Sequence, residues 1–180
     1  MISGDAKFAE DHFSLFGLPV AFAINADELD RRYRELLGRV HPDKHVNLSD
    51  ADQRVAMQWA TRANEAYQVL KNPLQRAHYL LLLKAHDPGV ESNTSMPTDF
   101  LVAQLELREQ ASQAESDRDM EALESLDGEL RSEMKAQYLA LADALDRRAD
   151  YPLASGIVRQ LMFQEKLLQE IDRAIESIEA

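Results

Sequence analysis

The chain contains no cysteine, and glycine and proline are scarce, with six residues each among 180. The lack of cysteine excludes disulfides, thiolate chemistry and cysteine-ligated zinc or iron–sulfur centres for this chain alone. The residues that dominate instead are Leu, Ala, Glu, Gln and Arg, which favour helices over sheets. We find no strand-like alternation of any length and no repeat at a solenoid period. The composition therefore predicts an all-α protein.

Long apolar runs are also missing. The longest, "YLLLL" at 79–83, is far shorter than the roughly 20 residues that a membrane-spanning helix needs. The N-terminal stretch has no basic region followed by an apolar run, and it is too acidic for a mitochondrial presequence. We expect a cytoplasmic protein that does not bind membranes.

Positive charge is in deficit, with 20 Lys and Arg against 32 Asp and Glu, for a formal net charge of −12. An acidic field repels phosphate backbones, so we expect no nucleic-acid partner unless a local basic patch overrides it. The apolar share of 45% and the charged share of 29% are typical of a soluble globular protein. The length allows one ordinary domain or two small ones.

Turn-forming residues gather in "HDPGVESNTSMPTD" at 86–99, which is the best candidate for a linker. We accordingly predict a first domain at 1–86, a linker at 87–99 and a second domain at 100–180.

Helical spacing in the first half predicts an antiparallel helical hairpin. One helix is capped by Asn25 or Asp27 and runs to about Val40, and the next begins near Ser49 or Asp50. The expected apolar stripes are Leu29, Tyr33, Leu36, Leu37 and Val40 on the first helix, and Val55, Trp59, Ala63, Ala66, Tyr67 and Leu70 on the second. "DHFSLFGLP" is expected to form a short helix that packs on the hairpin, and "PLQRAHYLLLLKAH" a further helix.

Three long periodic segments in the second half, at about 98–114, 117–149 and 151 to the end, predict an antiparallel three-helix bundle. The stripe of the second segment is Met120, Leu123, Leu126 or Asp127, Leu130, Met134, Tyr138, Leu141 and Leu145. The stripe of the third is Ile157, Leu161, Leu168, Ile171, Ile175 and Ile178.

The first of these helices carries apolar residues on two sides. At about 100° per residue, one side holds Phe100, Ala103, Leu107, Ala111 and Ala114, and the other holds Leu101, Val102, Leu105, Glu106 and Glu109. The second side either contacts the other half of the chain or forms an exposed docking site with an apolar centre and an acidic rim.

Phe163 lies off the stripe of the third helix, so it is either an interface anchor or core in a thicker bundle.

The stretch "VHPDKHV" at 40–46 allows several interpretations. It suits an ordinary loop after a helix. As a metal site it offers His41, Asp43 and His45, but Pro42 interrupts the helix and no further cluster completes a ligand set. A catalytic His–Asp pair lacks a nucleophile with a defined place.

The preceding helix adds a basic strip opposite its apolar stripe, consisting of Arg31, Arg32, Arg34 and Arg39. Such a strip is either a solvated face or a surface that an acidic partner selects.

A basic helix that ends in His-Pro-Asp resembles the J-domain, the module that engages DnaK-type ATPase chaperones. "FSLFGLP", "LDRRYRELLGRVHPDK" and "ANEAYQVLKNPLQRAHYLL" fall in J-domain order and spacing. The resemblance implies that this loop and the basic face dock on the chaperone and stimulate its ATP hydrolysis. The residues that it assigns to chaperone binding are His41, Pro42, Asp43, Tyr33, Arg34, Arg39 and Lys44, with Arg31 a weaker candidate.

"FLVAQLELRE" and "VRQLMFQEKL" extend the likeness to the second half. From about His12 to its end the chain resembles the HscB family of iron–sulfur cluster co-chaperones. The family resemblance implies a bundle that binds the scaffold protein IscU while the J-domain presents it to the chaperone HscA. It assigns scaffold binding to Leu101, Val102, Leu105, Glu106, Glu109 and Phe163. Val102 is smaller than the methionine that we expect there, and Gln113 replaces an expected acid. The absence of an N-terminal cysteine motif favours a bacterial-type member.

We therefore expect a monomeric two-domain adaptor with no active site, metal or cofactor of its own, which binds a chaperone and a scaffold at once. Three rival functions remain. They are a J-protein that delivers another client, an enzyme with histidine-bound metal, and a nucleic-acid-binding hairpin.

Overall fold

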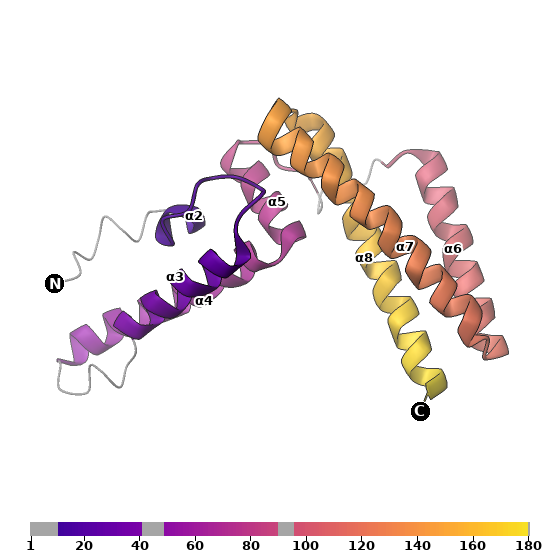
Figure 1. The fold of residues 1–180 in the computed structure, drawn as a ribbon, viewed down its shortest axis with the longest axis horizontal. Helices are drawn as coiled ribbons and strands as arrows, with labels where there is room; N and C mark the ends of the chain where they lie inside the picture. Colours follow the sequence, from indigo (N-terminus) through magenta and orange to yellow (C-terminus); the bar gives the residue numbers. More distant parts are fainter. Residues whose placement is uncertain (1–10, 41–48, 90–95, 180) are drawn as a thin grey trace. The chain divides into compact units, whose positions relative to one another are not determined.

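The computed structural model of the chain describes residues 11–40, 49–89 and 96–179, and every regular element within these ranges is helical (Figure 1). The elements are α2 (His12–Leu15), α3 (Ala26–Val40), α4 (Asp50–Lys71), α5 (Pro73–Leu83), α6 (Thr98–Asp117), α7 (Met120–Ala142), the π-helical turn η2 (Asp143–Arg148) and α8 (Tyr151–Glu179). The predicted all-α fold is confirmed. Among the described helices, none combines the length and apolar character needed to cross a bilayer.

Residue contacts divide the chain into two compact units, Met1–Leu80 and Leu81–Ala180. The division falls within α5, ahead of the linker that the sequence predicts at 87–99. The boundaries 1–86, 87–99 and 100–180 stay a prediction.

The helices of the first unit begin where side chains can satisfy their first backbone N–H groups. Asn25 Oδ1 accepts a hydrogen bond from the Glu28 amide at 3.0 Å, so Asn25 rather than Asp27 caps α3. The Ser49 hydroxyl accepts from the Asp52 amide at 3.3 Å at the start of α4. Pro73 opens α5, where its missing N–H costs nothing.

Helices α3 and α4 lie side by side as a hairpin (Figure 1), and a ring stack and several polar contacts join them. The rings of Tyr33 and Tyr67 stack with their centroids 4.0 Å apart. The Tyr33 hydroxyl donates to Asn64 Oδ1 at 2.8 Å. The Lys71 ammonium lies 2.6 Å from the Asp30 carboxylate and, by hydrogen bonding, lowers the pKa of that carboxyl. These contacts fix the register of the two antiparallel helices.

The predicted stripe of α4 is correct in its centre and wrong at its start. Trp59, Ala63 and Leu70 are buried. Val55, however, is 38% exposed, and its neighbour Ala56 is buried in its place. At about 100° per residue, Val55 and Ala56 lie on either side of Trp59, about 40° and 60° away from it, so the helical period alone does not decide which of the two is buried.

Helix α2 packs its aromatic side chains onto the hairpin, as predicted. Phe13 and Phe16 are buried. The guanidinium of Arg32 on α3 donates to the carbonyl oxygens of Phe16 at 2.8 Å and Gly17 at 3.0 Å. Gly17 has a φ of +61°, and a Cβ added there would lie 2.5 Å from Arg32 Nη1. Glycine suits this turn chiefly because of its left-handed backbone, and a Cβ would in addition displace the end of the Arg32 side chain from its two carbonyl partners.

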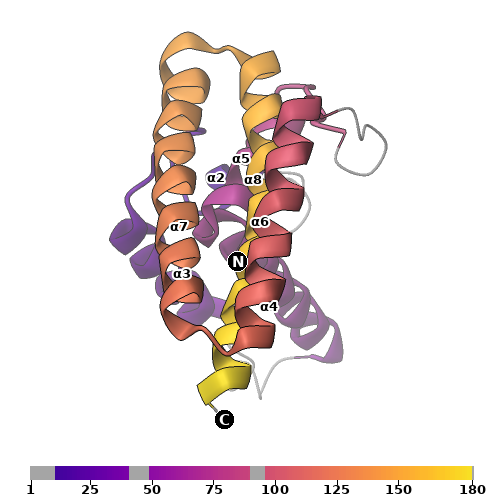
Figure 2. The ribbon, with the colours of Figure 1, turned by 90° about the vertical axis from the view of Figure 1, so that its right-hand side faces the viewer.

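Helices α6, α7 and α8 form the predicted bundle (Figure 2). α6 and α8 run parallel, because the pairs Arg108–Glu170 and Glu115–Ser177 have the same sequence separation. α7 runs antiparallel to α8, with Arg131 bound to Asp172, Gln164 to Glu133 and Tyr138 to Glu165. These contacts set the rotation of each helix about its own axis.

The observed rotations show that the predicted apolar stripes of α6 and α8 are wrong at some positions. Ala103, expected in the core, is exposed, while Gln104 is 3% exposed and takes the core position. On α8, Leu167 is fully buried and Leu168 is only half-buried. An amide in the core was not expected, since burial of a polar group disfavours folding unless hydrogen bonds compensate.

The bundle ends also differ from the prediction. Helix α7, predicted to begin at about residue 117, begins at Met120, and the Asp119 side chain accepts a hydrogen bond from the Ala122 amide at 3.0 Å. Its α-helical part ends at Ala142, and the remainder to Arg148 is a π-helical turn. Ala149 follows with a φ of +51°, which stops the helix.

We predict opposite effects for two glycine-to-alanine substitutions in the first unit. Gly17→Ala should lower the free energy of unfolding by about 1–3 kcal/mol, because it forces a left-handed backbone and a clash with Arg32. Gly38→Ala is the matched control, since a Cβ there meets nothing within 4 Å. It should raise stability by about 0.5–1 kcal/mol through better helix propensity.

Urea unfolding followed by the fluorescence of Trp59 measures both variants, because this chain has one tryptophan and it is buried in α4. Equal effects of the two substitutions would contradict the role of the Gly17 turn.

Candidate partner-binding sites

The His-Pro-Asp motif lies outside the described residues. His41, Pro42, Asp43 and Lys44 all fall between the end of α3 and residue 49. Their assignment to chaperone binding, and the alternative of a metal site at the same motif, therefore stay predictions from the sequence. Within the described ranges, no three His, Asp or Glu side chains converge as metal ligands would.

The basic strip on α3 is partly neutralised within the protein. The Arg31 guanidinium forms ion pairs with Glu28 at 2.7 Å and with Glu35 at 2.5 Å. Arg32 Nε lies 2.6 Å from the same Glu28 carboxylate. Hydrogen bonds from Arg31 and Arg32 lower the pKa of Glu28 to about 2, so this carboxylate is charged at neutral pH. Two of the four predicted basic side chains are therefore bound to acids of their own helix.

The other predicted contacts on α3 differ in accessibility. Arg34 and Arg39 are exposed, as a contact surface requires. Tyr33 is half-buried, and both its ring and its hydroxyl serve the hairpin by stacking on Tyr67 and donating to Asn64. Tyr33 thus has a structural role whether or not a partner touches it.

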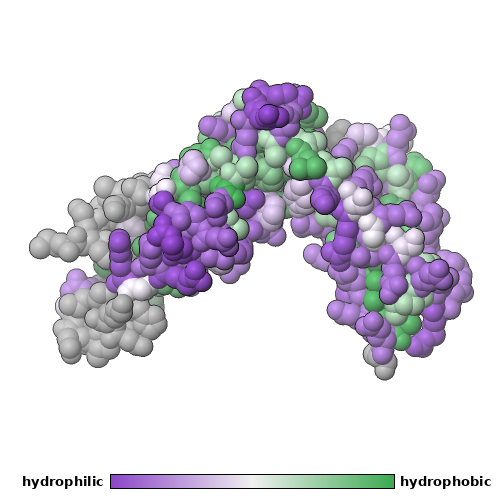
Figure 3. All heavy atoms as spheres, viewed as in Figure 1, coloured by the Kyte–Doolittle hydropathy of each residue, from purple (hydrophilic) through white to green (hydrophobic). Residues whose placement is uncertain are grey.

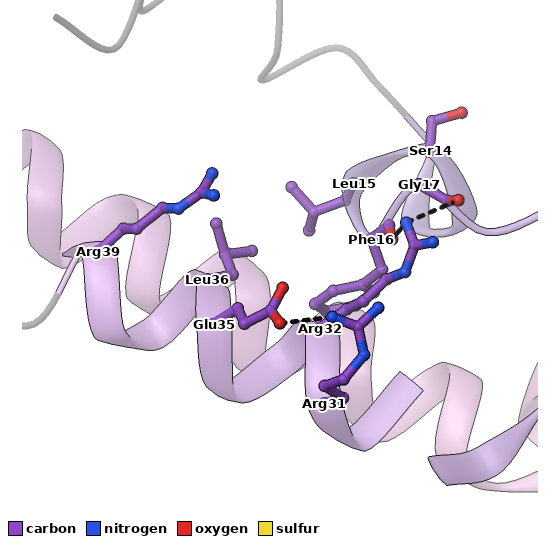
Figure 4. Close-up of a pocket in the computed structure, with 9 residues that line it drawn as sticks. All are labelled: Ser14, Leu15, Phe16, Gly17, Arg31, Arg32, Glu35, Leu36 and Arg39. Atoms are coloured by element: carbon purple, nitrogen blue, oxygen red, sulfur yellow. Dashed lines mark hydrogen bonds and ion pairs between the residues drawn. The ribbon is translucent and has the colours of Figure 1, made fainter. Parts of the chain in front are cut away.

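A hollow of about 420 Å³ lies beside this strip, between α2 and α3 (Figure 4). We refer to it as the α2–α3 hollow. Its lining consists of Ser14, Leu15, Phe16, Gly17, Arg31, Arg32, Glu35, Leu36 and Arg39. Sequence reasoning missed this feature. Its one signal was the glycine in "SLFGLP", which marks a turn but does not reveal that Arg32 reaches the turn.

The predicted scaffold-binding residues of α6 lie mainly on its outer side. Val102 is 48% exposed and Leu105 is 58% exposed. Glu106 and Glu109 are also exposed, whereas Leu101 is half-buried. In Figure 3, hydrophobic residues are exposed among hydrophilic ones along the bundle. Two exposed aliphatic side chains next to two carboxylates form the apolar centre and acidic rim that the sequence predicts.

Phe163 on α8 contacts α6 through Phe100, which the helical period places on the other side of α6 from Leu105. Its ring meets that of Phe100 edge to face, with the centroids 6.2 Å apart and the planes at 87°. The side chain is half-buried. Phe163 therefore packs at the seam between α6 and α8 and also keeps accessible surface, so it can serve both the bundle and a partner. Gln113, which replaces the expected acid, is exposed and donates to Asp117 Oδ2 at 2.7 Å.

Two sequence families match this chain, one in each half. The family described as "DnaJ domain" matches residues 11–79. The family described as "HSCB C-terminal oligomerisation domain" matches residues 96–172. The first match covers the hairpin that leads to His-Pro-Asp, and the second covers α6, α7 and most of α8.

Complete relatives carry both halves. A protein of Ralstonia nicotianae named "Co-chaperone protein HscB homolog" is 47% identical over 171 residues, which span 95% of this chain and 97% of that protein. Among solved structures, "Chaperone HscB from Vibrio cholerae" is similar with a TM-score of 0.83 at 32% identity, covering 94% of this chain and 99% of the other. The human co-chaperone protein HscB is similar with a TM-score of 0.84 at 25% identity, covering 92% and 82%.

The exposure of Leu105 yields a stability prediction. Leu105→Ala should change the free energy of unfolding by less than about 0.5 kcal/mol, because the side chain is mostly in water already. Leu123→Ala, at a fully buried position of α7, should lower it by about 2–5 kcal/mol. Urea unfolding followed by circular dichroism compares the two. A loss of similar size in both variants would place Leu105 in the core and remove it from the candidate surface.

Proposed function

The chain belongs to the HscB family of co-chaperones, and on that premise we propose which proteins it connects. Its DnaJ domain makes an Hsp70-type (DnaK-type) ATPase chaperone its partner. The chaperone that we propose is HscA-like, and the client is an IscU-like iron–sulfur scaffold protein. The observation that carries this proposal is the presence, in one chain, of both family halves at 47% identity to a co-chaperone of that name.

We assign stimulation of the chaperone ATPase to the first unit. His41, Pro42, Asp43 and Lys44 would form the contacting loop, and Arg34 and Arg39 would contribute exposed cationic charge from α3. Tyr33 would contribute mainly by holding α3 on α4. Cations on an otherwise acidic protein favour an acidic partner surface, and the attraction should weaken with salt.

We assign scaffold binding to the outer side of α6 together with Phe163. Leu105 and Val102 supply accessible apolar area, and Leu101 and Phe163 flank it with half-buried side chains. Glu106 and Glu109 are exposed beside them and would select a scaffold surface with basic groups. In many interfaces a few apolar anchor residues contribute most of the binding free energy, and the residues around them contribute little.

The same acidic side chains argue for a monomer rather than for self-association through this face. A two-fold dimer formed there would bring Glu106 and Glu109 near their own copies, and like charges repel. We propose that the protein acts as a cytoplasmic adaptor without a cofactor, and that ATP hydrolysis and any cluster chemistry belong to its partners. Binding both partners at once would raise the concentration of scaffold at the chaperone.

His41→Gln should abolish stimulation of the chaperone ATPase and leave scaffold affinity unchanged, because the motif and the scaffold face lie in different units. Steady-state ATP hydrolysis and calorimetric titration with the scaffold measure the two properties. His86→Gln, at a histidine outside the predicted contact, is the control and should keep full stimulation. Survival of stimulation in His41→Gln would sink the assignment of the loop.

Replacing both Leu101 and Leu105 by alanine should weaken scaffold binding by about 1–3 kcal/mol and leave chaperone stimulation in the absence of scaffold intact. Leu139→Ala is a matched control, since Leu139 is 69% exposed and lies on α7, which contributes no residue to the proposed face. It should bind scaffold normally. If the control loses as much affinity as the double variant, the effect is not specific to α6.

A further inference from the structure

The α2–α3 hollow lies beside α3, and apart from Arg39 none of its lining residues belongs to the proposed contacts. Three arginines, Arg31, Arg32 and Arg39, line it against a single acid, Glu35. Glu28 pairs with Arg31 and Arg32, and Asp11 accepts a hydrogen bond from Ser14 at the rim, so acids also lie around the hollow, but the lining residues themselves carry three cations and one anion. On a chain with a net charge of −12, this local reversal selects an acidic group.

The hollow is apolar as well as cationic. Leu15 from α2 and Leu36 from α3 point toward one another across it, and Arg39 lies at the end toward the close of α3 (Figure 4). Both leucines are half-buried, so each still exposes apolar surface to water. An aliphatic side chain placed between them would remove that surface from water, which is favourable.

The walls are fixed before any partner arrives. Arg32 holds the end of α2 by donating to the carbonyl oxygens of Phe16 and Gly17. The start of α2 is held by Asp11, whose carboxylate accepts from the backbone amides of Phe13 and Ser14. A preformed hollow avoids the entropic cost of ordering its walls on binding.

The hollow also adjoins the surface proposed for the chaperone. Arg39 belongs to both, and only Val40 separates Arg39 from the His-Pro-Asp sequence. We infer that the α2–α3 hollow receives a segment of the Hsp70-type chaperone that carries a carboxylate beside an aliphatic side chain. Helix α2 would then add to the surface through which α3 and the loop after it contact the chaperone. This inference rests on the proposed function, since it takes the chaperone as the occupant.

The first test removes the one acid in the lining. Glu35→Gln should lower the concentration needed for half-maximal stimulation of the chaperone ATPase by about threefold at low salt, because the hollow then attracts a carboxylate more strongly. Tighter binding cannot arise from a damaged fold. Glu176→Gln is the matched control: it changes the net charge equally at an exposed position on α8, and it should leave this concentration unchanged.

The second test adds an acid at the rim. Ser14 is exposed and donates its hydroxyl to Asp11 Oδ2 at 2.7 Å. Ser14→Glu should raise the half-maximal concentration by about threefold relative to Ser14→Gln, and the difference should shrink as salt is added. Both variants lose the same hydroxyl contact, so their comparison isolates the charge.

Measuring His41→Gln in the same assay distinguishes a failure of this inference from a failure of the proposed function. Suppose that His41→Gln abolishes stimulation while Glu35→Gln equals Glu176→Gln and Ser14→Glu equals Ser14→Gln. The hollow is then not a contact, and the proposed function stands. Full stimulation by His41→Gln overturns the proposed function itself, and the inference with it.

Discussion

A helix that packs on its neighbours buries only one side, and its other side stays accessible to water. Both candidate sites of this protein consist mainly of side chains on the accessible sides of their helices. On α6, burial of Gln104, Ala111 and Ala114 turns Val102 and Leu105 outward. On α3, burial of Leu29 against α4 leaves Arg34 and Arg39 in water. The rotation of each helix about its axis therefore decides which residues a partner can touch, and a few contacts between helices set that rotation.

Several of those contacts are polar. Arg32 ties α3 to the end of α2, and Asp30 with Lys71 ties α3 to α4. In the bundle, Arg108 with Glu170 and Arg131 with Asp172 connect α8 to its two neighbours. Each such pair is partly exposed, and pairs of this kind add little stability individually. Each pair joins residues that lie at the same height on two helices, so together the pairs are consistent with the register that the buried side chains set.

The arginines of α3 serve two purposes, which a count of charges does not separate. Arg31 and Arg32 are committed to Glu28 and Glu35 or to backbone carbonyls, so part of the apparent basic strip holds the fold together. Arg39 and Arg34 remain exposed at the end that leads to His-Pro-Asp. The exposed cationic charge that a partner meets is therefore concentrated toward this end of α3, where Arg39 also lines the α2–α3 hollow, and it lowers the repulsion that an acidic protein presents to an acidic partner.

The helical fold class and the approximate starts of α3, α4 and α5 could be predicted from the sequence, because caps, prolines and a period of 3.6 residues are local properties. The same period put Val102 and Leu105 on one side of α6, but it left open whether that side is exposed or contacts the other half of the chain. Motif order indicated the family that the comparisons show. Packing between the helices settles that Ala56 rather than Val55, and Gln104 rather than Ala103, are buried. The tertiary structure also brings Arg32 to Gly17 and Phe163 to Phe100. These outcomes depend on side chains that meet across helices far apart in sequence, and a pattern read along one helix does not contain its neighbour's rotation.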